Sequence, residues 1–220
     1  IGIYDPNTNT YSESELPTNI TAASNSINGK FSGGVLAPNG NIIFVPHLIN
    51  RIGIYYPSNN TFNSIQVNSI SGKFNGGVLA PNGKIIFVPS QINNTEQVGI
   101  YDPIKNEYTF GQNNITHTET GGEFFDQGAS SYKWAGGVLA PDGKIIFVPL
   151  KASCIGIYDP IADRYSNGPT ISEITDSATA KFYGGVLAPN GKIILVPHRT
   201  GHVGIYGTEY PLKNDSNTDI

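Results

Sequence analysis

The sequence has no methionine and only one cysteine among its 220 residues. The lone cysteine, Cys154, excludes a disulfide within the chain and leaves the redox compartment open. The start of the sequence shows no basic segment followed by an apolar segment, the pattern of a signal peptide. Because methionine is absent and Ile1 lies inside a repeat, we expect the chain to be a processed or partial piece of a longer protein.

Long apolar runs and charged residues are also scarce. No run approaches the roughly 20 apolar residues that cross a bilayer as a helix, so we expect no membrane insertion by this chain. Lysine and arginine number 13 against 17 acidic residues, which gives a net charge of −4. A general nucleic-acid-binding protein normally carries a basic face, and we therefore expect no nucleic-acid partner.

The motifs of several common enzyme classes are missing. The sequence contains no phosphate-binding Gly-Lys-Ser/Thr loop, no Gly-x-Ser-x-Gly nucleophile elbow and no His-Glu-x-x-His pair. Proline and glycine leave no window of about ten residues with the 3.6-residue period of a helix. These absences favour a protein without helices, without catalytic residues and without a cofactor, and we expect it not to be an enzyme.

What the sequence does contain is a repeat. The segment "GGVLAPNGKIIFVP" occurs with few changes at four positions, which begin at Gly33, Gly76, Gly136 and Gly184. A second segment, typified by "IGIYDPNTNTYS", lies between these copies and begins at Ile1, Ile52, Val98 and Ile155, with a truncated copy at Val203. Together they define a unit of roughly 50 residues, and a fixed period in that range indicates a repeat architecture.

Each unit contains four short segments with strand-like composition. We name them strand a ("GGVLAP"), strand b ("KIIFVP"), strand c ("IGIYDP") and strand d ("NTYS"). Pro-Asn-Gly or Pro-Asp-Gly joins strands a and b, and these residues supply the backbone angles of a tight hairpin. Asp-Pro-x-x-Asn joins strands c and d and is a second turn signal. The pattern predicts a four-stranded antiparallel sheet in each unit.

Strand b is apolar at consecutive positions, as in Ile85, Ile86, Phe87 and Val88. A continuous apolar run indicates that both faces of the sheet are covered. Repeated four-stranded sheets that cover one another form a β-propeller, in which blades surround a central axis. The paired glycines of strand a fit the innermost strand, where backbones crowd together. A β-solenoid is the alternative, but its repeats usually lack two tight hairpins.

These segments resemble the YVTN-type β-propeller repeat of surface-layer and related extracellular proteins. Residues 34–45 and 52–60 follow the pattern of that family, as do the other copies, over about half of the chain. The Gly-Gly doublet, the Val-Pro end of strand b and the longer d–a connections depart from it. The resemblance implies a propeller and leaves the activity open, because such repeats serve many functions.

We expect an all-β protein in which residues 1–220 form one β-propeller domain or part of one. The expected units are residues 2–52, 53–98, 99–155 and 156–203, with a partial unit at 204–210 and a polar tail at 211–220. Four blades would close if the first c–d pair joined the last a–b pair. The extra strand c at Val203 competes for that place, which favours a larger ring with further blades.

The order of strands predicts that a–b and c–d turns share one face of the propeller, and that b–c and d–a loops share the other. The turns are nearly invariant between units, whereas the loops vary. The b–c loops are 47–51, 90–97, 150–154 and 198–202, and the d–a segments are 13–30, 64–73, 110–133 and 167–181. Varied loops on a rigid scaffold usually carry binding, so we expect any ligand on the d–a/b–c face.

Lysines, histidines and one tryptophan in or beside these loops are candidate ligand-binding residues. A lysine precedes the aromatic residue that begins each strand a, and a ring of lysines would attract an anion, an acidic sugar or an acidic peptide. The alternative for the pairs of lysine and aromatic residue is a packing role. The alternative for the histidines is that they are ordinary surface residues of polar loops. The candidates are Lys30, Lys73, Lys133, Trp134, Lys181, His47, His198 and His202, to which His117 adds the fourth histidine.

Two further patterns carry less information. Asp5, Asp102 and Asp159 precede proline at the same position of the unit, and turn capping explains them better than calcium binding or catalysis. No carboxylate sits at a recognisable metal-ligand spacing, so no metal site is expected. Asn-x-Ser/Thr sequences would accept glycans in a secretory setting. They are at Asn19, Asn59, Asn93, Asn114 and Asn214.

Three functional hypotheses remain. The first is a non-enzymatic interaction or structural module on a cell or particle surface, including that of a virus, as a component of a larger assembly. Its partner would be a protein or a glycan. The second is a lectin-like propeller, and the third is a propeller hydrolase or lyase. The first two place the partner on the d–a/b–c face. The sequence leaves the localisation open and favours an extracellular or particle surface.

Overall fold

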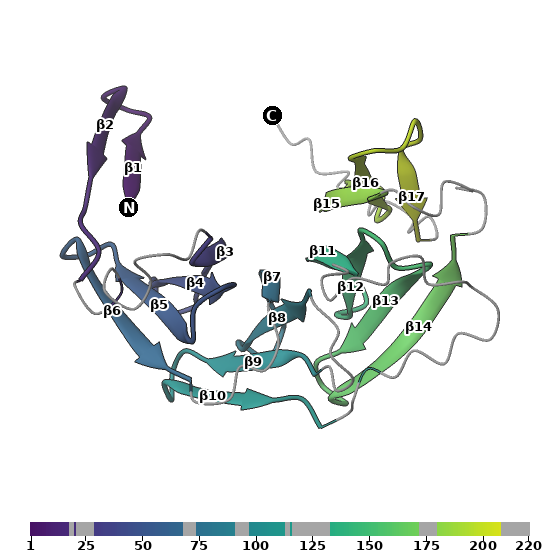
Figure 1. Cartoon of the computed structure of the whole chain (residues 1–220), viewed down its shortest axis with the longest axis horizontal. Coiled ribbons are helices and arrows are strands. Elements are labelled where there is room, and N and C mark those ends of the chain that lie inside the picture. Colours follow the sequence, from purple (N-terminus) through teal and green to yellow (C-terminus); the bar gives the residue numbers. More distant parts are fainter. Residues whose placement is uncertain are drawn as a thin grey trace, which may run out of the picture.

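The computed structural model describes residues 1–17, 20, 29–67, 74–90, 97–112, 115, 133–171 and 180–207. Within these residues, 17 β-strands form five antiparallel sheets arranged side by side in an open arc (Figure 1). Three sheets have four strands, one has three and one has two. The predicted all-β propeller architecture is therefore confirmed. The described part of the chain contains no helix long and apolar enough to cross a membrane.

The three four-stranded sheets are complete blades, and their strands follow the order a, b, c, d. Blade 1 comprises β3 (Phe31–Leu36), β4 (Ile42–Pro46), β5 (Arg51–Tyr56) and β6 (Thr61–Gln66). Blade 2 comprises β7 (Phe74–Leu79), β8 (Ile85–Pro89), β9 (Gly99–Asp102) and β10 (Glu107–Phe110). Blade 3 comprises β11 (Trp134–Leu139), β12 (Ile145–Pro149), β13 (Cys154–Asp159) and β14 (Arg164–Thr170).

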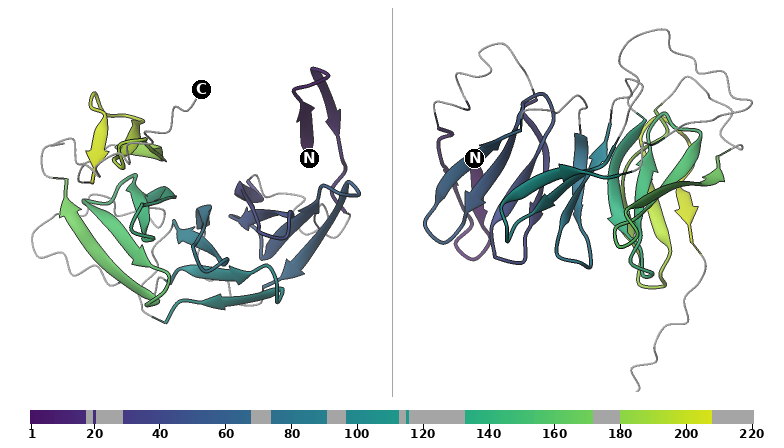
Figure 2. Two further views of the ribbon diagram at one scale, coloured as in Figure 1. Left: turned by 180° about the vertical axis from the view of Figure 1, so that it is seen from behind. Right: turned by 90° about the horizontal axis from the view of Figure 1, so that it is seen from below.

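The two ends of the arc carry incomplete blades. Blade 4 has strands a, b and c only, as β15 (Phe182–Leu187), β16 (Ile193–Pro197) and β17 (Gly204–Tyr206). The N-terminal hairpin has strands c and d only, as β1 (Gly2–Asp5) and β2 (Thr10–Glu13). Figures 1 and 2 show that the hairpin and blade 4 lie on opposite sides of the opening in the arc.

Strand a is the innermost strand of each blade, as predicted (Figure 1). Its first glycine has a positive φ, +86° in Gly76, and the pairing register shifts at this point. Only glycine takes this conformation readily, and the shift forms a bulge. A Cβ on Gly76 would lie 3.1 Å from Cα of Gly136 in the next blade. Backbone crowding near the axis therefore explains the first glycine of the doublet.

The second glycine packs against the preceding blade. A Cβ on Gly77 would lie 2.9 Å from Cγ2 of Val45 and 3.2 Å from Cγ2 of Val35. The same contact recurs between the other consecutive blades, where Gly137 faces Val78 and Val88 and Gly185 faces Val138 and Val148. The apolar core thus lies between blades, which explains why β8 and β12 are buried along their whole length.

An aromatic cluster lies within each complete blade. In blade 2 the ring of Phe87 on strand b lies 5.6 Å from that of Phe74 on strand a and 6.1 Å from that of Tyr108 on strand d. Blades 1 and 3 have the same arrangement, with Phe31, Phe44 and Phe62 in one and Trp134, Phe147 and Tyr165 in the other. These clusters join the inner strands to the outer strand, and burying large aromatic surfaces stabilises the blade.

Candidate functional site

Hydrogen bonds between consecutive blades show which loops lie together on each face of the arc. Asn39 and Asn82, in a–b turns, donate from Nδ2 to the carbonyl oxygens of Pro103 and Pro160, in the c–d turns of the following blades, both at 3.0 Å. On the opposite face, the backbone N–H of Lys133, just before blade 3, donates to the carbonyl of Ser90 in the b–c loop of blade 2 at 3.0 Å. The turns thus share one face and the b–c and d–a loops share the other, as the strand order predicts.

On the loop face, two of the lysines before strand a, Lys133 and Lys181, lie in the contact between blades. Lys133 and Lys181 are 6% and 4% exposed. Nζ of Lys181 donates to the carbonyl oxygen of Ala152 in the b–c loop of blade 3, at 3.2 Å. Its backbone N–H donates to the carbonyl of Leu150 at 2.7 Å. This lysine therefore fastens blade 4 to blade 3 at a main-chain acceptor.

The other members of that candidate set are placed differently. Lys30 is half-buried, and Lys73 lies outside the described residues. Trp134 is fully buried and meets Phe147 edge to face, which agrees with a packing role. Ligand binding by the lysines stays a prediction, and Lys133 and Lys181 would have to leave the contact between blades to meet a ligand.

Two of the histidines occupy the same position of the repeat and have different surroundings. Nδ1–H of His47 donates to the carbonyl oxygen of Phe74 in the next blade, at 2.8 Å. His198 is exposed, and its ring lies 5.6 Å from that of Tyr183. His202 donates its backbone N–H to Oγ1 of Thr200, and His117 lies outside the described residues. The structure therefore assigns His47 a contact between blades that the sequence did not predict.

The repeated aspartates cap their own turns. Oδ1 of Asp102 accepts the backbone N–H of Ile104 and of Lys105, each at 3.0 Å. The bond from Lys105 is the main cause that lowers the pKa of Asp102 below its ordinary value. Asp5 and Asp159 make equivalent bonds, so the turn-capping interpretation is confirmed. Among the described residues, no group of three or more His, Cys, Asp or Glu side chains could hold a metal ion.

Of the predicted glycan acceptors, Asn59 alone is described. Its side chain accepts the backbone N–H and hydroxyl of Thr61, at 3.2 and 2.6 Å, within the c–d turn of blade 1. The other four, Asn19, Asn93, Asn114 and Asn214, lie outside the described residues. Because Asn59 is exposed, the turn leaves it accessible, and glycosylation stays a prediction.

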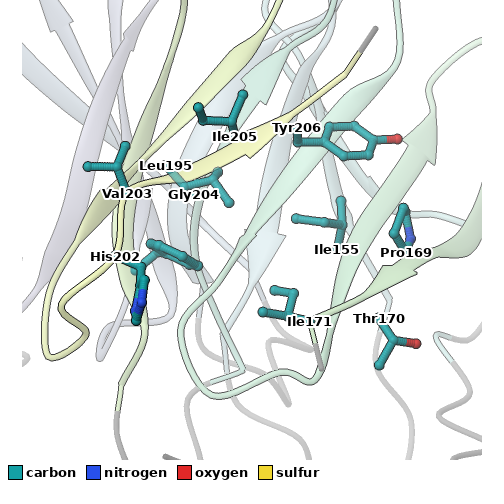
Figure 3. A pocket seen from close by; sticks show the side chains of 11 residues that line it. Ile155, Pro169, Thr170, Ile171, Leu195, His202, Val203, Gly204, Ile205 and Tyr206 are labelled. Carbon is teal, nitrogen blue, oxygen red and sulfur yellow. The ribbon is translucent and has the colours of Figure 1, made fainter. Parts of the chain in front are cut away.

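A cavity of about 360 Å³ lies between blades 3 and 4 (Figure 3). Phe182 and Leu195 of blade 4 and Ile155 of blade 3 line it. The other lining residues are Pro169, Thr170, Ile171, His202, Val203, Gly204, Ile205 and Tyr206. His202 and Tyr206 are the ionisable residues in this lining. The cavity therefore suits an apolar or aromatic group better than acid–base chemistry.

The cavity lies where the complete blades place the aromatic residue of strand d. In blade 1, a Cβ on Gly53 of strand c would lie 2.7 Å from the ring of Phe62 on strand d. Gly204 is the equivalent residue of blade 4, which has no described fourth strand. The sequence held a signal for this difference. An aromatic residue follows the tyrosine of strand c by seven positions in the complete blades, whereas Lys213 occupies that position after Tyr206.

No protein-family model and no curated protein sequence matches this chain. Solved structures match its fold. Virginiamycin B lyase from Staphylococcus aureus has a TM-score of 0.63 and 13% identity over 96% of this chain and 63% of its own. The extracellular domain of BT4673 from B. thetaiotaomicron, described as a putative one component system, has a TM-score of 0.57 and 12% identity over 89% of this chain and 23% of its own.

An auxiliary nutrient binding protein from Bacteroides ovatus is a third match, with a TM-score of 0.54 and 15% identity over 82% of this chain and 43% of its own. These likenesses show the propeller fold, and at such low identity they show the fold alone. The chain spans about 63% of the length of the lyases. Membership of the YVTN-type family stays a prediction from the sequence motifs.

Proposed function

We propose that this protein is a non-enzymatic β-propeller module of a cell or particle surface, and that it binds a partner protein through the d–a/b–c loop face. The observation that carries the proposal is the difference between the two faces. Asn39 and Asn82 on the turn face are occupied in bonds between blades, and the turns around them are nearly identical. The loop face combines the same rigid support with loops that differ in every unit.

The described parts of the loop face support this division. The b–c loop of blade 1 reads "HLINR", whereas that of blade 3 reads "LKASC". Both are held by backbone hydrogen bonds to the lysine before strand a, such as His47 N–H to Lys30 and Leu150 N–H to Lys133. Because main-chain groups fix these loops, their side chains are free to vary. Such surfaces commonly bind partners on a rigid scaffold.

A loop exchange tests the proposal. In one variant the d–a segment 110–133 is replaced by the shorter segment 64–73, which already connects blades 1 and 2. In the matched control, Lys144 on the turn face is changed to Ala, which removes its exposed ion pair with Asp142. Parent and variants are immobilised and exposed to surface extracts of the source particle or cell, and each captured protein is quantified.

We expect the loop exchange to abolish capture of at least one protein that the parent and the Lys144 control retain. Equal capture by all three proteins would contradict the proposal, as would loss in the control alone. Melting curves of each variant establish that the blades stay folded.

A lectin is the second candidate, and one observation favours it. Tyr183 and His198 form an exposed ring pair where blade 4 meets the loop face. Exposed aromatic rings are suited to stacking on apolar or sugar surfaces. A glycan array distinguishes the two functions: binding that is lost in Tyr183→Ala and retained in Tyr4→Ala, an exposed tyrosine of the N-terminal hairpin, would favour the lectin.

A further inference from the structure

The a–b turns of blades 1 and 2 carry the dipeptide Asn-Gly on the turn face, at Asn39-Gly40 and Asn82-Gly83. Both asparagines are exposed to water. Asparagine is chemically labile, and it is most labile before glycine, because glycine has no side chain that hinders attack by its backbone nitrogen. We call Asn39 and Asn82 the clamp asparagines, since each also donates a hydrogen bond to the following blade.

The reaction at such a dipeptide is deamidation, which needs water and no other reactant. The backbone nitrogen of the glycine gives up its proton and attacks Cγ of the asparagine. The bond from Cγ to Nδ2 breaks, ammonia leaves, and a cyclic succinimide remains. Water then opens the ring to aspartate or isoaspartate, so that the net change is the loss of ammonia and the gain of water.

The folded turn holds both the attacking and the leaving group. In blade 2 the backbone N–H of Gly83 donates to the carbonyl of Ala80 at 2.9 Å, which opposes loss of its proton. Nδ2 of Asn82 donates to the carbonyl of Pro160 in blade 3 at 3.0 Å, and Oδ1 accepts the backbone N–H of Lys84 at 3.1 Å. The turn of blade 1 has the same three bonds. Deamidation therefore requires that the turn and its contact with the next blade open.

Blade 3 shows what the product of this reaction does to the turn. Asp142 occupies the position of the clamp asparagines, followed by glycine as they are. Its Oδ1 accepts the backbone N–H of Lys144 at 3.1 Å, and its Oδ2 pairs with Nζ of Lys144 at 2.9 Å. The turn thus keeps its shape with aspartate. An ionised aspartate has no donor, however, and cannot make the bond that Asn82 makes to a carbonyl oxygen.

We propose that the clamp asparagines are sites of spontaneous deamidation, at which the chain records the opening of its blade contacts. While a contact is closed, its Asn-Gly dipeptide is protected. When the contact opens by local unfolding, the amide groups are released and the reaction proceeds. The product has lost the donor, so the contact closes without its original bond and opens more often afterwards.

The two sites differ in what compensates the new charge. Asn82 is followed two residues later by Lys84, just as Asp142 is followed by Lys144, so its product can form the ion pair of blade 3. Asn39 is followed by Asn41, and its product has no lysine at this position. Both contacts lie between complete blades, and the inference is independent of the partner proposed for the loop face.

Rates of deamidation test the proposal. The parent protein is incubated at mildly alkaline pH, and peptides that contain each Asn-Gly dipeptide are analysed by mass spectrometry for the exchange of ammonia for water. The same chain unfolded in urea gives the unprotected rates. We expect both clamp asparagines to react at least about 10-fold more slowly in the folded protein, which corresponds to about 1.4 kcal/mol for opening. Equal rates in the folded and the unfolded chain would overturn the proposal.

Two matched variants open one contact each. Gly77→Val loosens the contact between blades 1 and 2, because a Cβ on Gly77 would lie 2.9 Å from Cγ2 of Val45. Gly137→Val loosens the contact between blades 2 and 3, where a Cβ on Gly137 would lie 3.1 Å from Cγ2 of Val88. Melting curves establish that each variant is folded. If a valine variant does not fold, the alanine variant at the same position takes its place.

We expect Gly77→Val to accelerate deamidation of Asn39 by about 10-fold and to leave the rate at Asn82 unchanged. Gly137→Val should have the converse effect, so each variant is the control for the other. If a folded variant accelerates both sites equally, or accelerates neither, then opening of the individual contact does not control the reaction and the proposal is wrong.

Variants that imitate the product test its consequence. Asn39→Asp and Asn82→Asp should both unfold at a lower urea concentration than the parent, because each loses a bond between blades. The decrease should be larger for Asn39→Asp, and addition of Lys84→Ala to Asn82→Asp should remove this difference. Parental midpoints in both variants would show that the lost donor does not weaken the contact. Equal decreases in both would show that Lys84 does not compensate the charge.

Discussion

Blades 3 and 4 have nearly the same inner sequence and differ in how much of it is buried. Val138 and Val186 both follow a Gly-Gly doublet, yet the first is covered by the next blade and the second is open to solvent. Strand order, bulge and turn geometry are the same in both. The comparison shows that local structure in this chain is encoded within a unit, whereas burial depends on the adjacent unit.

The largest expected difference between covered and uncovered positions concerns the second glycine of strand a. Gly77→Val should lower the free energy of unfolding by about 3 kcal/mol, because the new side chain overlaps Val45 and Val35 of the preceding blade. Gly34→Val should cost about 1 kcal/mol, since blade 1 has no described preceding strands a and b. Urea denaturation measures both values.

Equal destabilisation by the two glycine substitutions would contradict this difference. It would mean that contacts within the blade, such as the 3.3 Å approach of a Cβ on Gly34 to Phe44, decide the cost. If neither substitution lowers the free energy of unfolding, strand a is not crowded.

An intermediate difference is expected for the asparagine of the a–b turn. Asn82 holds its own turn and also donates to the carbonyl of Pro160 in the next blade. Asn190, the equivalent residue of blade 4, accepts Lys192 N–H in its own turn in the same way. Asn82→Ala should therefore cost about 1 kcal/mol more than Asn190→Ala, the usual net value of one hydrogen bond. Thermal and urea unfolding of the two variants measure this difference. Equal losses of stability in both variants would contradict the prediction.

The smallest expected effect concerns pH. Burial of Tyr101, with lesser contributions from the charges of Tyr56 and Asp102, raises its pKa from 10.0 to about 12. The folded protein thus keeps this proton at pH values where the unfolded chain loses it, so the associated stability is present below about pH 10 and is lost as the pH rises toward 12.

Tyr101→Phe should therefore make the free energy of unfolding fall less steeply between about pH 10 and pH 12. Tyr4→Phe makes the same change at the equivalent position of the exposed hairpin and serves as the matched control. Urea titrations at several alkaline pH values provide the measurement. If the free energy of unfolding has the same pH slope in the parent and in Tyr101→Phe, the prediction is wrong.

The sequence predicted the strands, their order and the innermost position of strand a, because those features depend on local chemistry. Gly-Gly, Pro-Asn-Gly and the continuous apolar run of Ile85–Val88 can each be recognised in the sequence of a single unit. The roles of His47 and Lys181 were not predictable in this way. Their acceptors are main-chain carbonyl oxygens of Phe74 and Ala152 in another blade. Every residue has such an oxygen, so the residue type in the sequence does not identify the acceptor.

The cavity was predictable in part. The missing aromatic residue after Tyr206 is visible in the sequence, but its consequence requires knowing that Phe62, Tyr108 and Tyr165 pack onto strands a and b. The exposure of Val186 and Leu36 was not predictable from their own units, since identical units are buried elsewhere. Only the arrangement of the whole arc distinguishes an end from an interior position.

The use of main-chain acceptors between blades has a consequence for how such a protein can grow. A donor such as Asn82, His47 or Lys181 needs no particular side chain in the adjacent unit, because every residue carries a carbonyl oxygen. A gene duplication that inserts one more unit would therefore create a fitting neighbour at once, without compensating substitutions on either side. The repeat can lengthen or shorten by whole units, while selection acts on the loops of each unit separately.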